Sequence, residues 1–192
     1  MNAFRFAVGT LPQQPSRPSR PGLIAAAPSF PFDPSIISRY LLDESDLSEQ
    51  EEVAIYTYWL SKQRADGLTY RQDVDPTDLA SLLPHMFIIG VDDKGAFRFR
   101  LMGTHLSDVY GLELTGKTLA SCQLSPESVS VIEATYRITM EEGTPALLTG
   151  DWRDLQRPWV RFRALHLPLC RPDGSAGYIV GTTTYRSGKD RI

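Results

Sequence analysis

The alternation of apolar and polar residues along the chain predicts five β-strands. In residues 97–102, Phe and Leu alternate with Arg and Met, and this period of two is what a strand with one buried face requires. Residues 85–91 are almost all apolar, which is typical of a strand buried on both faces. The turn-forming residues 92–95 join these two strands into an antiparallel hairpin. Three further strand-like runs lie at 146–152, 159–169 and 176–185.

Helical spacing of apolar residues predicts two longer helices. Ser48, followed by Glu51 three positions later, is a capping box, so a helix is expected over about residues 49–64. Ser125 and Pro126 begin a second helix that ends at Gly143. The apolar stripe of the first helix must pack against the sheet or against a second protomer. Its candidate interface residues are Val53, Tyr56, Trp59 and Leu60.

The rest of the chain is organised around the point where the strand 97–102 ends at Gly103. Thr104 can cap a short helix that begins at His105, and Gly111 can end that helix in the left-handed conformation. Two strands, a helical middle and three strands predict an α+β fold. Its expected core is a five-stranded antiparallel sheet, with short helices and one longer connector helix on one face, plus the N-terminal helix.

The 192 residues are enough for one domain with extensions. Residues 1–34 hold seven of the fourteen prolines, so 1–46 is predicted to be a Pro-rich, largely irregular extension. It is either a docking arm or a segment without a fixed partner. The domain itself is expected at 47–186, with its N-terminal helix within 47–64, and a short C-terminal tail at 187–192.

Charge and cysteine content favour a cytoplasmic protein that binds neither nucleic acid nor membrane. The net charge is −3, and no cluster of Lys and Arg suits a phosphate backbone. The two cysteines, Cys122 and Cys170, are too few for a disulfide framework, which favours a reducing compartment. The longest apolar runs fall well short of the length that spans a bilayer.

Two motifs resemble those of PAS domains. Residues 98–104 read R-x-R-L-x-G-T and residues 110–117 read Y-G-x-E-L-T-G-K. Together with Tyr58-Trp59 in the first helix and Val74-Asp75-Pro76 before the first strand, they resemble a compact bacterial single-PAS family. The resemblance extends over about residues 50–186.

The resemblance implies a sensory or protein-interaction module in bacterial signal transduction. PAS domains hold small ligands between the inner face of the sheet and the short helices, so the resemblance allows a small apolar ligand here, and no cofactor is predicted. The same residues could instead fill the core and leave no cavity. The residues expected to line a pocket are Phe87, Ile89, Phe99, His105, Tyr110, Leu119, Tyr136, Leu148 and Phe162.

The sequence predicts neither catalysis nor a metal site. It contains no nucleophile elbow, phosphate-binding loop or zinc-protease motif. His85, His105 and His166 are scattered, and Cys122 does not stand in the reactive-cysteine motif of flavin-binding PAS domains. The alternative is a carrier or small enzyme on a cone-shaped α+β fold. An unpaired acid and a histidine that converge in one pocket would favour that enzyme.

The resemblance also implies how such a module passes on its signal. Its output is expected to go to a signalling protein such as a kinase. A homodimer through the N-terminal helix or the outer face of the sheet is also expected. A ligand or partner can shift the module only if it binds two of its conformations unequally.

Overall fold

One antiparallel sheet runs through the part of the chain that the computed structural model describes, residues 36–40 and 44–187. Its six strands lie in the order β1-β4-β5-β6-β2-β3, and every neighbouring pair is antiparallel. The strands are β1 (Ile36–Tyr40), β2 (Met86–Val91), β3 (Phe97–Met102), β4 (Ala146–Trp152), β5 (Arg157–Cys170) and β6 (Ala176–Ser187).

The five predicted strands all form, and β1 adds a sixth at the edge of the sheet. β1 lies within residues 1–46, which the sequence indicated as largely irregular, and it pairs with β4 from Ile36 opposite Gly150 to Tyr40 opposite Ala146. A five-residue strand gains its stability from the strand beside it, so its local sequence alone does not predict it. Residues 1–35, 41–43 and 188–192 of the predicted extension and tail lie outside the described residues.

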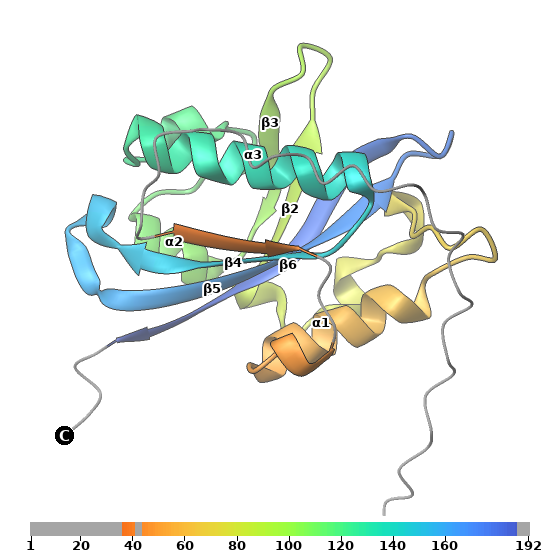
Figure 1. Ribbon diagram of the computed structural model, residues 1–192, viewed down its shortest axis with the longest axis horizontal. Coiled ribbons are helices and arrows are strands. Elements are labelled where there is room, and N and C mark those ends of the chain that lie inside the picture. The colour runs from red at the N-terminus through yellow and green to blue at the C-terminus, as the bar shows by residue number, and fades with distance from the viewer. Residues whose placement is uncertain (1–35, 41–43, 188–192) are drawn as a thin grey trace, which may run out of the picture.

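Helices cover both faces of the sheet. Figure 1 shows α3 (Pro126–Glu142) across one face and α1 (Gln50–Ser61) across the other. The face under α3 and α2 (Thr104–Tyr110) is called the inner face here, and the face under α1 the outer face. Short 3₁₀ turns connect the elements: η1 (Glu44–Asp46), η2 (Arg71–Asp73), η3 (Pro76–Leu79), η4 (Leu83–His85), η5 (Leu119–Ser121) and η6 (Arg153–Leu155).

Each face of the sheet has its own hydrophobic core. Along β2, Phe87 and Ile89 join the inner core, whereas Met86 and Ile88 join the outer one. All four side chains are almost fully buried, so the prediction of a strand buried on both faces is confirmed. The inner core holds the inward stripe of α3, and the outer core holds the buried face of α1.

The capping of α1 differs from the prediction by one residue. The N-cap is Glu49 rather than Ser48, and the acid that closes the box is Glu52 rather than Glu51. Glu52 Oε2 accepts from the backbone N–H groups of Ser48 at 3.0 Å and Glu49 at 3.3 Å. Glu52 also binds Arg163 of β5 with both carboxylate oxygens, at 2.7 and 2.9 Å. This tertiary ion pair selects Glu52 over its neighbour.

The four candidate interface residues of α1 divide between core and surface. Tyr56 and Trp59 are buried in the outer core, and Trp59 Nε1 donates to the Pro168 carbonyl at 2.9 Å. Leu60 packs partly buried against the same core, and Val53 remains about half exposed. The aromatic residues of this stripe therefore contact the sheet of their own chain.

Gly103 forms the predicted corner between β3 and α2. Its backbone is extended, and Gly103 itself rather than Thr104 is the N-cap of α2, with no side-chain cap. A Cβ atom here would lie 2.2 Å from the Pro84 carbonyl oxygen and 2.3 Å from that of Leu83. Close approach of η4 therefore requires glycine. Gly111 ends α2 with φ 68°, as predicted.

Candidate functional site

A cavity of about 60 Å³ lies between the inner face of the sheet and the helices α2 and α3. Seven of the nine predicted pocket residues line it. They are Phe87, Phe99, Tyr110, Leu119, Tyr136, Leu148 and Phe162. A cavity of roughly 150 Å³ holds benzene. In this conformation the space therefore suits a few water molecules or a ligand of a few heavy atoms, and a larger ligand would need the helices to move.

The other two predicted residues lie outside the cavity lining. Ile89 is fully buried in the inner core beside it. His105 contacts His85 instead, with the two Nδ1 atoms 3.3 Å apart and the rings nearly perpendicular. The Nε2 atom of His85 lies 3.9 Å from Glu51 of α1. His105 therefore belongs to a contact between α2, η4 and α1.

The sequence analysis missed eleven of the eighteen lining residues, and His166 is the histidine among them. It lies on β5, is 2% exposed, and its ring sits about 5 Å from the rings of Phe87 (5.2 Å) and Tyr136 (5.3 Å). Its Nδ1 atom has no hydrogen-bond partner among the described residues. Burial lowers the pKa of His166 from 6.5 to about 4, so the imidazole is neutral at neutral pH.

The strand pattern contained the signal for His166. Side chains alternate between the two faces of a strand, so residues two apart on β5 share a face. Phe162 was predicted to line the pocket, and Ala164 and His166 follow it at the same spacing. All three line the cavity. Counting forward from Phe162 therefore identifies His166.

Two tyrosines add hydroxyl groups to the mostly apolar lining. Tyr136 comes from α3 and Tyr110 from the end of α2. Burial raises the pKa of both phenols, so they stay protonated and can donate a hydrogen bond. Cys122, near Tyr110, is buried in the inner core, and burial raises the pKa of its thiol to about 12. It is therefore a thiol and not a thiolate at neutral pH.

The two carboxylates at one end of the cavity are already engaged. Asp151 binds Arg153 through both oxygens and Arg161 through one, and the Arg153 guanidinium holds the pKa of Asp151 below its usual range. Asp154 accepts from the backbone N–H and the hydroxyl of Ser125, the N-cap of α3, both at 3.0 Å. The cavity thus combines a histidine whose Nδ1 atom has no partner among the described residues with an ion-paired Asp151 and a hydrogen-bonded Asp154.

Residues 36–40 and 44–187 contain neither a metal-binding cluster nor a membrane-spanning helix. No group of three His, Cys, Asp or Glu side chains is placed to hold a metal ion in this part of the chain. No described helix has the length and apolar character needed to cross a membrane. The cavity is therefore the candidate site that we develop.

Comparison with known proteins gives a family match and similarities to solved structures. A family model described as a PAS domain matches residues 47–184. None of the curated proteins that were compared matches the sequence. A solved structure titled "Structure of an RNA-binding Light-Oxygen-Voltage Receptor" is similar with a TM-score of 0.39 and 11% sequence identity. That similarity covers 80% of this chain and 39% of the receptor chain.

Proposed function

Because this chain belongs to the PAS domain family, whose members are generally sensory modules, we propose that it senses a small uncharged molecule in its inner cavity. The observation that supports this proposal most directly is that the buried Nδ1 atom of His166 has no hydrogen-bond partner among the described residues. A buried polar atom without a partner costs about 1–3 kcal/mol, and a ligand that binds it removes this cost. The proposed ligand is mostly apolar, with one hydroxyl or similar group that faces His166.

The charge state of the cavity supports an uncharged ligand. His166 is neutral at neutral pH, and the tyrosine hydroxyls beside it are protonated. The nearby Asp151 carboxylate is already bound to arginines. The described lining contains no Lys or Arg side chain, so a buried anionic ligand would find no counter-charge there, and its desolvation would be expensive.

The proposed output passes through β5 to a signalling protein such as a kinase, in the cytoplasm of a bacterium. Alternate residues of β5 face the two cores, so His166 lines the cavity while Leu165 and Leu167 pack under α1. A ligand that favours one position of this strand would also favour one position of α1. The outer face of the sheet and α1 are the proposed route to the partner and to a second protomer.

Sensing is favoured over catalysis by the chemistry of the cavity. A general base works best when its pKa is near the working pH, whereas burial lowers the pKa of His166 to about 4. An enzyme would be favoured by a histidine that converges with an unpaired acid. In this cavity Asp151 is bound to Arg153, and Asp154 accepts a hydrogen bond from Ser125. We therefore propose a non-enzymatic module.

Native mass spectrometry of the protein purified from its own host tests this proposal. The expected result is a retained small molecule in the wild type and in His85→Leu, a matched change outside the cavity lining. His166→Leu should bind that molecule roughly tenfold or more weakly, because a buried hydrogen bond is lost. The same spectra report the oligomeric state.

A complementary experiment uses xenon and 2-propanol as probes, followed by amide NMR shifts. Xenon needs only an apolar space, so it should bind both the wild type and His166→Leu. 2-Propanol should bind His166→Leu more weakly than it binds the wild type. Protein that carries no small molecule from its host and admits neither probe would overturn the proposed ligand site.

A further inference from the structure

An exposed group of arginines lies on the outer face of the sheet, beyond the end of α1. Figure 1 shows the β4–β5 turn and the end of β6 projecting past α1. Arg161 of β5 and Arg186 of β6 lie directly opposite each other there, with side chains 72% and 77% exposed. Arg153 of η6 joins them because it shares Asp151 with Arg161. We call Arg153, Trp159, Arg161 and Arg186 the arginine surface.

Trp159 gives this surface an apolar centre. It precedes Arg161 by two positions on β5, so the two side chains share the outer face. Trp159 is 45% exposed, whereas Trp59 and Trp152 are each only 6% exposed. Trp and Arg are the residue types that most often dominate the energy of protein interfaces.

The accessible charge of the surface is positive, although the chain as a whole carries −3. The Asp151 side chain is only 3% exposed and that of Glu49, the partner of Arg186, only 16% exposed. A molecule that approaches therefore meets guanidinium groups rather than carboxylates. Like charges directly opposite each other on neighbouring strands are also destabilising, as for Arg161 and Arg186.

Both arginines retain hydrogen-bonding capacity. The ion pair with Asp151 uses one N–H of Arg161, at 3.3 Å, and the pair with Glu49 uses one terminal nitrogen of Arg186, at 2.9 Å. A guanidinium has five N–H donors in a planar fork that matches a carboxylate. Carboxylates of a partner could therefore bind both side chains and relieve their mutual repulsion.

We propose that the arginine surface binds an acidic segment of a partner protein, with an apolar side chain of that segment on Trp159. A nucleic acid fits less well, because tight binding to a phosphate backbone needs many more cationic contacts than this surface offers, and the net charge of −3 opposes it. The four residues of this surface lie outside the cavity lining, and Asp151, which binds Arg153 and Arg161, connects the two.

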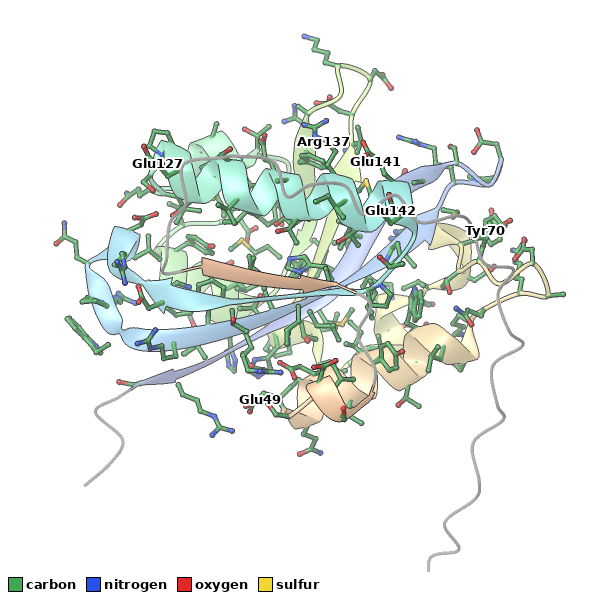
Figure 2. The ribbon with its side chains drawn as sticks, viewed as in Figure 1. Glu49, Tyr70, Glu127, Arg137, Glu141 and Glu142 are labelled. Atoms are coloured by element: carbon green, nitrogen blue, oxygen red, sulfur yellow. The ribbon has the colours of Figure 1, made fainter. Side chains whose placement is uncertain are left out.

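A second copy of this chain is the competing occupant. Figure 2 shows Glu127, Glu141 and Glu142 along α3, on the side of the sheet opposite Glu49. A contact between α3 of one copy and the arginine surface of another would join two different patches, which generates rings or open filaments rather than a two-fold dimer. Arg137 also lies among these acids (Figure 2), which weakens their match to arginines.

The test measures binding of the full-length protein to a fluorescent, Asp- and Glu-rich synthetic peptide with a central leucine. Binding should weaken with added salt and should be absent for a peptide with Asn and Gln in place of the acids. Arg161→Gln and Arg186→Gln should each weaken binding by roughly three- to tenfold. Arg137→Gln removes the same charge from exposed α3 and should leave the affinity within about twofold.

The proposal is overturned by four outcomes, each measured on variants whose melting temperatures match the wild type. The first is no binding of the acidic peptide. The second is equal weakening by Arg137→Gln, which would indicate non-specific attraction. The third is tighter binding of an oligo-dT of equal charge. The fourth is self-association that Arg161→Gln abolishes, which would assign the surface to a second copy.

Discussion

Protonation of His166 is expected to destabilise the folded protein as the pH falls from about 6.5 to about 4. Burial holds the pKa of this imidazole near 4 in the folded state, against 6.5 for an exposed histidine. Each pKa unit is worth about 1.4 kcal/mol, so the difference of 2.5 corresponds to about 3 kcal/mol of stability at most. This is a large part of the 5–15 kcal/mol that stabilises a typical domain.

The sign follows from which state binds the proton. Above pH 6.5 the imidazole is neutral in both states, and its contribution to the free energy of unfolding is constant. Between pH 6.5 and 4 the unfolded chain takes up a proton that the folded chain excludes, so unfolding becomes more favourable. Below about pH 4 both states are protonated, and the loss levels off.

Urea denaturation of the wild type and of His166→Leu at about pH 7 and pH 4.5 measures this effect. The wild type should lose about 2–3 kcal/mol more than the variant on acidification, because the carboxylate contributions are common to both. At pH 7 the ligand-free variant should be at least as stable as the wild type, because the unpaired Nδ1 atom is gone. An identical loss in both proteins would refute a buried, neutral His166.

Two further predictions concern the backbone and the buried ion pair. Gly103→Ala should destabilise the domain by about 3 kcal/mol or more, because the new Cβ atom would meet the Pro84 carbonyl. Gly111→Ala should cost only about 1–2 kcal/mol, for the left-handed backbone at that position. Equal melting temperatures of the two variants would contradict this difference. Glu52→Gln should lower the free energy of unfolding by about 2 kcal/mol, because it weakens the ion pair with Arg163. The double variant with Arg163→Gln should lose less stability than the two single variants added together, and strict additivity in urea denaturation would show that the pair is not coupled.

The strands could be predicted from the sequence because their pattern is local. The hairpin of β2 and β3, the short α2 ended by Gly111 and the long α3 begun at Ser125 all follow from period, turn and cap residues within a few positions. The α+β fold follows from the order of these elements. The type and order of these elements were therefore predicted correctly.

The wrong predictions concern features that depend on contacts with distant segments of the chain. β1 exists because β4 offers an edge more than a hundred positions away. Glu52 rather than Glu51 closes the cap of α1 because Arg163 binds it from β5. Gly103 rather than Thr104 is the N-cap of α2, and the nearby carbonyls of η4 leave no room for a side chain there. Each of these depends on a tertiary contact that no window of sequence contains.

The candidate site shows the same division. Seven aromatic and aliphatic lining residues were accessible to pattern and resemblance, and His166 was within reach of the alternation along β5. The volume of the cavity could not be predicted from the sequence, because it depends on how α2 and α3 pack against the sheet to within the size of a methyl group. His105 shows that a helix can border a cavity while one of its side chains turns away to another partner, His85.

β5 connects both proposed sites, because its alternate residues serve different layers. His166 faces the cavity, Arg163 holds the start of α1 through Glu52, and Arg161 belongs to the arginine surface. A sheet strand moves as a unit, since its backbone is hydrogen-bonded on both sides to β4 and β6. Ligand binding at His166 can therefore change the acidic-peptide affinity by displacing β5, or through Asp151, which lines the cavity and binds Arg153 and Arg161. An unchanged affinity would mean that the two sites act independently.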